Sequence, residues 1–240
     1  MLVFILAFCS CLVSSQAADL PSYIPKCSLT DPKLNDCIRD NANKAIPMIA
    51  KGDIFFGLPN LSPVSFREAP LKATNLLIIL TDTYSDAFKD LKITRILFDL
   101  PKRKLEMSGS FDRVEVTAKN YRVESGEFIG VKAQGQGKFN MTLLKATIDF
   151  KADLRIYEKE GENYIDMVNR VVTTDLEHAY YDFENLKSAD NDDMNAYIAK
   201  HWKEFRIQMK PVFDVYIRQL LSYPTGVILT KVPLNKLFLP

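Results

Sequence analysis

Histidine is almost absent from this chain, with 2 in 240 residues, and glycine is scarce at 9. His178 and His201 belong to no His-Glu-x-x-His pattern, and the Ser-Gly-Ser sequence at 108–110 is not the Gly-x-Ser-x-Gly turn of a serine hydrolase. The Gly-Gln-Gly sequence at 135–137 lacks the third glycine of a nucleotide-binding loop. The sequence therefore predicts no catalytic residue, no metal and no cofactor, and a hydrolase is a minor alternative.

The chain also lacks an excess of either charge. Its 31 Lys and Arg residues are balanced by 30 Asp and Glu residues, which leaves a net charge of +1. Such a balance creates no field that would attract a polyanion. The basic cluster at 101–104 begins a strand pattern, where it is read as a solvated edge. Nucleic acid is therefore not an expected partner.

Long apolar runs are missing beyond the N-terminus, so stable membrane insertion is not expected. Residues 1–17 carry no charged side chain and end in a small-x-small pattern at 15–17, as secretory signal peptides do. This leader lacks the usual Lys or Arg, which keeps a membrane anchor as an alternative. We expect a secreted, extracellular protein in which residues 18–240 form one domain, because no Gly-, Ser- or Pro-rich linker divides them.

Cysteine is equally sparse once the leader is removed. Cleavage after residue 17 removes Cys9 and Cys11 and leaves Cys27 and Cys37 in an oxidising compartment. These two are predicted to form a disulfide that ties the N-terminal segment to the helix that follows. A zinc site is the other reading, but two cysteines without a nearby histidine cannot supply four ligands.

What the sequence does contain is an unusually long strand pattern. Between 144 and 156 every odd position is polar and every even position is apolar: Leu144, Ala146, Ile148, Phe150, Ala152, Leu154 and Ile156. At about 3.3 Å per residue this segment spans roughly 43 Å, about twice an ordinary strand. A sheet with such strands twists and curls, and its apolar face must be filled by another element or by a ligand.

Further strand patterns predict an antiparallel meander. They cover 73–80, 91–100, 104–118, 121–125, 128–143, 144–157, 164–174 and 177–183. Inward-facing residues change from odd to even positions after Phe111, and a bulge near Asp112 or Arg113 would account for this. The proline-containing stretch 53–70 reads as extended edge structure.

Two helices are predicted. Asp31-Pro32 begins an amphipathic helix that reaches Lys51, and Pro47 should kink or shorten it. A second helix is predicted over 191–221, about 46 Å long at about 1.5 Å per residue. Pro211 should bend it and the Pro-Thr-Gly sequence at 224–226 should end it, with 227–239 returning as a final strand.

Taken together, these features resemble the insect takeout and juvenile-hormone-binding protein family. The resemblance is carried by the Cys27/Cys37 pair around Asp31-Pro32, Gly-Gln-Gly at 135–137, Phe-Glu-Asn-Leu at 183–186, Met-Asn at 194–195, Trp202, and Val-Pro-Leu at 232–234 with Phe238. It implies an α+β fold of the tubular lipid-binding type, in which a strongly curved antiparallel β-sheet wraps a long C-terminal helix around an internal tunnel. Such proteins look like extracellular carriers without enzymatic activity.

The chain is similar to the takeout branch in particular, because the hormone-binding branch carries an additional cysteine pair that is absent here. The expected partner is a hydrophobic small molecule: a terpenoid, juvenile-hormone-like, quinone or fatty ligand. The oligomeric state and the physiological role are left open by the residues. The alternative is an extracellular signalling or interaction protein whose vestigial tunnel is filled by side chains.

Candidate lining residues follow from the apolar faces. On the strands and the long helix they are Phe139, Met141, Leu143, Ile148, Phe150, Trp202 and Phe205. On the first helix they are Ile38, Ile46 and Ile49, if this helix acts as a lid, and ordinary docking on the sheet is the alternative. The small residues at 133–137 are expected to leave room for a ligand or for the helix backbone. At each single position, packing against the helix is the favoured explanation.

Two sequons predict N-glycosylation, at Asn60 and Asn140. Asn140 shares the polar face of its strand with Gln136 and Lys138, so a glycan there would point into solvent. Asn60 lies between two prolines and is the weaker candidate.

Overall fold

The computed structural model describes residues 18–239, so the predicted signal peptide at 1–17 lies outside the described residues. The elements in chain order are α1 (Leu34–Lys51), β1 (Val64–Ala73), β2 (Leu76–Ser85), the 3-10 helix η1 (Ala87–Asp90), β3 (Lys92–Asp99), β4 (Lys104–Phe128), β5 (Val131–Gln134), β6 (Gln136–Lys159), β7 (Glu162–Asp175), β8 (His178–Phe183), β9 (Lys187–Ser188), α2 (Met194–Lys200), α3 (Trp202–Lys231) and α4 (Leu234–Leu237).

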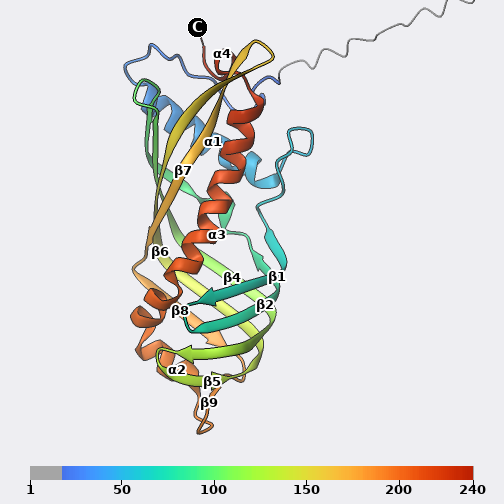
Figure 1. The fold of residues 1–240 in the computed structure, drawn as a ribbon, viewed down its shortest axis with the longest axis vertical. Coiled ribbons are helices and arrows are strands. Elements are labelled where there is room, and N and C mark those ends of the chain that lie inside the picture. Colours follow the sequence, from blue (N-terminus) through green and yellow to red (C-terminus); the bar gives the residue numbers. More distant parts are fainter. Residues whose placement is uncertain (1–17, 240) are drawn as a thin grey trace, which may run out of the picture.

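Two very long strands carry the sheet. β4 has 25 residues and β6 has 24, and they pair antiparallel from Lys104↔Asp153 to Arg122↔Gln136. The sequence patterns predict two strands in place of each of them, divided at 118–121 and at 143–144. Within the described residues the sheet is nine-stranded, and it curls around α3 without closing (Figure 1).

The neighbours of these two strands change halfway along. On one side of β4, β2 pairs with residues 117–126 and β3 pairs with residues 104–110. On the far side of β6, β8 pairs with residues 139–144 and β7 pairs with residues 147–159. The sheet therefore has two halves that share only β4 and β6. We call them the β1–β8 half, in which β1 forms the edge beside β2, and the β3–β7 half.

The inward faces of β4 and β6 also change at this junction, which we call the seam. Asp112 and Arg113 are both exposed and follow the buried Phe111. In β6, Lys145 has a φ of 51° and is exposed beside the buried Ala146. Phe111↔Ala146 and Arg113↔Leu144 remain partners in one register, so both strands change faces together.

The bulge predicted near Asp112 or Arg113 is therefore wrong. The register shift between β4 and β6 lies instead between Ala118 and Tyr121. At the seam the left-handed backbone of Lys145 reverses the alternation in β6, and Lys145 donates across the strands to Asp112 at 2.7 Å. This hydrogen bond lowers the pKa of the Asp112 carboxyl, since it favours the charged form.

α3 has 30 residues and runs along the concave side of the sheet, crossing both halves (Figure 1). Its first part buries Phe205, Met209 and Val212 in a core with the β1–β8 half, which we call the β1–β8 core. Its second part buries Leu221 in a separate core with α1 and the β3–β7 half, the β3–β7 core. One helix thus joins two hydrophobic cores.

The C-terminal part of the chain differs from the prediction. The predicted helix at 191–221 is interrupted at His201, which separates α2 from α3. α3 passes through Pro211 and Pro224 and ends at Lys231, and the predicted final strand at 227–239 is helix up to that point. Beyond it lies α4, and Leu239 makes only an isolated parallel bridge to Ser28.

Packing explains why Pro224 does not end α3. Its side chain is buried, and because it has no N–H, one backbone hydrogen bond of the helix is missing at this point. In the same turn, the Thr225 hydroxyl donates to the Leu221 carbonyl at 3.0 Å. The residues that follow, Val227 and Ile228 among them, pack against the β3–β7 core. The apolar surface that they bury outweighs the lost backbone hydrogen bond.

α1 ends at Lys51 as predicted, but it begins at Leu34 and not at Asp31-Pro32, and Pro47 lies inside it without ending it. Side-chain amides dock it on the edge of β3: Asn43 exchanges two hydrogen bonds with the backbone of Ile93, and Asn35 accepts one from Phe98 N. Cys27 and Cys37 form the expected disulfide. Over residues 18–239, none of the helices combines the length and apolarity that a bilayer crossing requires.

Because Phe205 is 1% exposed in the β1–β8 core, we expect Phe205→Ala to lower the free energy of unfolding by about 3–5 kcal/mol. Ile207 lies on the same helix but is 67% exposed, so Ile207→Ala should change it by no more than about 0.5 kcal/mol. Urea unfolding followed by circular dichroism measures both. Equal losses in the two variants would contradict the assigned helix face.

The disulfide joins cysteines separated by 10 positions, so its removal should lower the free energy of unfolding by about 2–3 kcal/mol through the entropy of the unfolded chain. The double variant Cys27→Ser/Cys37→Ser tests this by urea unfolding. Reduction of the wild-type protein should produce a similar loss, and the reductant should have no effect on the variant.

Candidate ligand cavity

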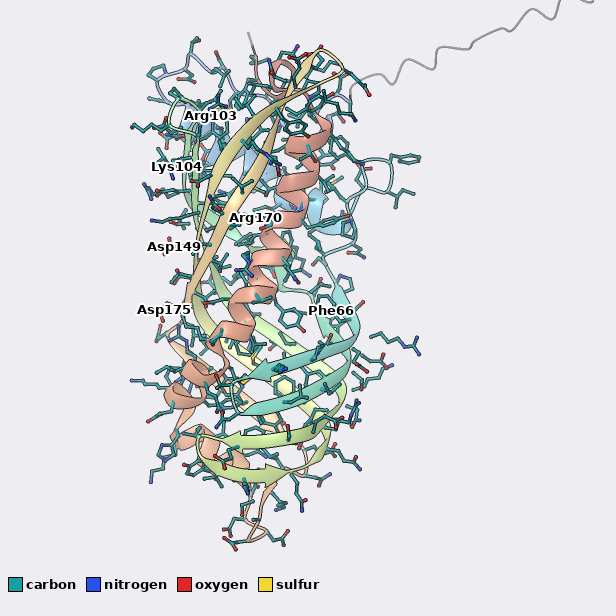
Figure 2. The ribbon with its side chains drawn as sticks, viewed as in Figure 1. Phe66, Arg103, Lys104, Asp149, Arg170 and Asp175 are labelled. Carbon is teal, nitrogen blue, oxygen red and sulfur yellow. A yellow bond between two sulfur atoms is a disulfide. The ribbon has the colours of Figure 1, made fainter. Side chains whose placement is uncertain are left out.

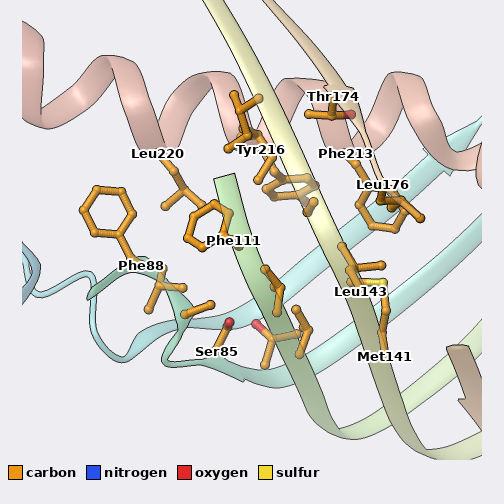
Figure 3. Close-up of a pocket in the computed structure, with 18 of the residues that line it drawn as sticks. Ser85, Phe88, Phe111, Met141, Leu143, Thr174, Leu176, Phe213, Tyr216 and Leu220 are labelled. Atoms are coloured by element: carbon orange, nitrogen blue, oxygen red, sulfur yellow. The ribbon is translucent and has the colours of Figure 1, made fainter. Parts of the chain in front are cut away.

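A cavity of about 200 Å³ lies at the seam, between α3 and the concave face of the sheet (Figure 3). Phe111, Ala146 and Ile148 of the β3–β7 core line one part of it. Leu80, Met141 and Tyr181 of the β1–β8 core line another part. The cavity is therefore the space between the two cores.

The change of faces at the seam explains why this space is not filled. Successive inward side chains on a strand are normally two residues apart. Across the seam they are three apart: Phe111 is followed by Val114, and Leu143 by Ala146. All four line the cavity. The short side chain of Ala146 widens the gap further.

The remaining walls come from α3 and from the edge of the sheet. Phe213, Tyr216 and Leu220 project from α3 toward the cavity in Figure 3, at the spacing of one helix face. Residues of β1, of β2 and of η1, including Phe88, complete the wall. Nearly all of this lining is apolar, so the cavity is suited to a molecule that avoids water.

One rim of the cavity is polar and electrically balanced. Arg206 donates to the Thr174 carbonyl at 3.1 Å and to Asp175 Oδ1 at 2.8 Å. Lys210 donates to Asp214 Oδ2 at 2.6 Å, and the Thr174 hydroxyl donates to Asp214 Oδ1 at 2.7 Å. Each cation is thus already paired with a carboxylate, and the rim offers no unpaired charge to a ligand.

The cavity reaches the surface beside β1. Phe66 and Tyr84 line it and are 38% and 48% exposed. Figure 2 shows Phe66 at the edge of the molecule, on β1. Between this edge and α3, the Phe66 and Tyr216 rings meet edge to face at 5.9 Å, and the Tyr216 hydroxyl donates to the Pro70 carbonyl at 3.1 Å. This side of the mouth is closed by few contacts.

Four of the candidate lining residues lie in the cavity wall: Phe139, Met141, Leu143 and Ile148. The other three on the sheet and the long helix do not line it. Phe150 is buried in the β3–β7 core, Phe205 stacks on Phe128 at 5.6 Å in the β1–β8 core, and Trp202 packs on His178 at 4.4 Å.

The candidates on α1 do not line the cavity either. Ile38, Ile46 and Ile49 pack against the β3–β7 core. α1 does contact η1, and Ala87 and Phe88 of η1 line the cavity. The helix is therefore one layer away from the cavity.

Gly135 and Gly137 were expected to leave room for a ligand or for the helix backbone, but they lie against another segment of the chain. A Cβ on Gly135 would lie 2.5 Å from the Tyr121 hydroxyl oxygen and 2.8 Å from the Asn185 carbonyl oxygen. The turn after β8 packs there, and the Tyr121 hydroxyl donates to the Glu184 carbonyl at 2.8 Å. These glycines make room for the chain itself, neither for a ligand nor for the helix.

Sequence reasoning missed the α3 face and the β1–β2 edge as lining. A signal for the first was present, because Phe213, Tyr216 and Leu220 recur at helical spacing. The same spacing is typical of a packing surface, so by itself it does not identify lining residues. No comparable signal marks β1, whose Phe66 and Leu71 lie among prolines and charged residues.

The two histidines lie outside the cavity lining. His178 packs between Tyr180 and Trp202, and the His201 ring lies 3.7 Å from Glu204. Within residues 18–239 no group of three metal-binding side chains comes together. Of the sequon residues, Asn140 is exposed and donates to Asp182 at 3.3 Å, and Asn60 is exposed and accepts from Ser62 N.

The match to one solved structure supports the fold. The crystal structure of Takeout 1 from Epiphyas postvittana matches with a TM-score of 0.75 and 19% identity, over 89% of this chain and 98% of that one. A crystal structure of a lipopolysaccharide binding protein matches at a TM-score of 0.39 and 12% identity, over 78% of this chain and 37% of that one. No curated protein sequence matches the chain.

The takeout-like arrangement of a curled antiparallel sheet around a long C-terminal helix is therefore confirmed. At the level of sequence, residues 3–239 match the family described as haemolymph juvenile hormone binding protein (JHBP). This match covers almost the whole chain, and the resemblance stated from the motifs agrees with it. The chain belongs to the haemolymph juvenile hormone binding protein family.

Proposed function

We propose that this protein is a secreted carrier that holds a hydrophobic small molecule in the seam cavity and performs no chemistry on it. The observation that carries the proposal is the apolar lining of a cavity between two separately packed cores. Burial of apolar ligand surface yields about 25 cal/mol per Å², which is the driving force for taking such a molecule out of water. Membership of a family named for hormone binding supports this assignment.

The ligand classes that fit are terpenoid, juvenile-hormone-like, quinone or fatty molecules. At about 200 Å³ the cavity is smaller than the roughly 300–1,000 Å³ of typical ligand pockets, so we propose that it widens when a ligand enters. The β1 side is suited to such movement, because β1 is an edge strand that, among residues 18–239, pairs only with β2. Its contact with α3 at Phe66 and Tyr216 is small.

Secretion follows from the leader at 1–17, and residues 18–240 are proposed as the mature ligand-binding unit. The exposed Asn140 on the outer face of β6 suits a glycan, as does the exposed Asn60. The small cavity volume also favours a second candidate, an extracellular interaction protein with a vestigial tunnel. Both candidates are separated by the experiment below.

The carrier proposal predicts that protein purified from its own tissue brings a hydrophobic adduct, visible by native mass spectrometry. Ala146→Phe extends a side chain into the cavity, so it should abolish the adduct and weaken binding of the probe N-phenyl-1-naphthylamine roughly tenfold or more. Lys151→Phe places the same ring on the exposed face of the same strand, so the adduct and the affinity for the probe should stay unchanged. Absence of an adduct and of probe binding in the wild type would favour the interaction protein.

A lid function of α1 stays a prediction with its own test. Because α1 contacts η1, whose Ala87 and Phe88 line the cavity, ligand binding should slow hydrogen exchange at residues 33–50. Residues 131–134 of β5, at the far end of the sheet, serve as the control and should exchange at the same rate. Unchanged exchange in α1 would mean that the helix is docked scaffold only.

A further inference from the structure

One side chain in the apolar cavity wall carries a buried polar group without a hydrogen-bond partner. Tyr181 of β8 lines the cavity and is 8% exposed, and its hydroxyl has no hydrogen-bond partner. Buried hydroxyl groups nearly always have a partner, because removing them from water without one costs free energy. An unpaired hydroxyl on a residue that lines a proposed ligand site is a candidate donor to the ligand.

The other polar side chains in the lining do not share this property. Thr83 and Ser85 donate to the Phe66 and Glu115 carbonyls, and the Tyr216 hydroxyl donates to Pro70. The groups of the rim, Arg206 and Lys210 among them, bond to one another as described above. Tyr84 is 48% exposed and has access to water. Among the described lining residues, Tyr181 is the buried donor that the protein leaves unpaired.

The position of Tyr181 is fixed by its neighbours. Its backbone pairs with Met141, another lining residue, and its ring packs edge to face on Phe205 at 4.8 Å. Burial raises the pKa of the phenol, and the nearby Arg206 only partly opposes this, so the hydroxyl stays protonated at neutral pH. It is therefore a donor held in place, which lowers the entropic cost of forming a new hydrogen bond.

We propose that Tyr181 is the polar anchor of the ligand site, donating a hydrogen bond to the oxygen of a neutral, otherwise apolar molecule such as a ketone or an ester. This inference rests on the proposed carrier function and specifies the ligand class. A carboxylate is disfavoured, because both cations of the rim are already paired with Asp175 and Asp214. A pure hydrocarbon would leave the hydroxyl unpaired and so bind less tightly.

The test compares 2-pentadecanone with pentadecane as competitors for N-phenyl-1-naphthylamine on the full mature chain. The wild type should prefer the ketone roughly five- to tenfold, the effect of one hydrogen bond. Tyr181→Phe should lose this preference through weaker ketone binding, with pentadecane binding retained. Tyr180→Phe is the matched control, since Tyr180 is the next residue on β8, 56% exposed and outside the lining, and it should keep the preference.

The stability of the ligand-free variant to urea distinguishes a ligand-anchoring role of the Tyr181 hydroxyl from a structural role. Tyr181→Phe removes a hydroxyl that bonds to nothing, so the ligand-free variant should be at least as stable as the wild type to urea. Equal binding of the two competitors to the wild type, or an unchanged preference in Tyr181→Phe, would overturn the anchor while leaving the carrier function intact. Failure of the wild type to bind the probe and both competitors would overturn both.

Discussion

The constraint on which the rest of the structure depends is that β4 and β6 change their inward faces together. Two strands of 25 and 24 residues would otherwise present one continuous apolar surface, which a single core would fill. Because the alternation reverses at Asp112 and Lys145 without a shift of register, the surface is divided into two parts. The two cores, the exchange of neighbouring strands and the cavity all lie around this point.

α3 makes one structure out of these two cores. It contributes Phe205 to one and Leu221 to the other, and it passes the cavity on the way. A helix that must reach both cores has to be long, and this explains why it continues through Pro224. The same geometry keeps the cavity from collapsing, because the helix is fixed by packing on either side of the seam.

Much of the fold could be predicted from residues 18–239 because the signals are local. The end of α1 at Lys51 follows from helical spacing, the disulfide from the count of cysteines, and the strand over 144–156 from strict alternation, whereas the full length of β6 does not. The end of α3 could not be predicted, because the packing of Val227 and Ile228 on distant strands decides it.

Part of the cavity wall could also be predicted from the sequence. Strand alternation alone identifies four inward positions that line it: Phe139, Met141, Leu143 and Ile148. Which inward residues meet a void and which, like Phe150, meet other side chains depends on the three-dimensional pairing of the two halves.

The unbroken register at the seam limits how this architecture can diversify. A single inserted or deleted residue in β4 alone would turn the inward side chains beyond it outward, unless a bulge absorbed the change, as happens between the buried Ala118 and Tyr121. Relatives should therefore vary the size and shape of the cavity by exchanging side chains of different volume, and place length changes in the hairpins at the ends of the long strands. Selectivity for different cargo would then evolve on a backbone of constant length.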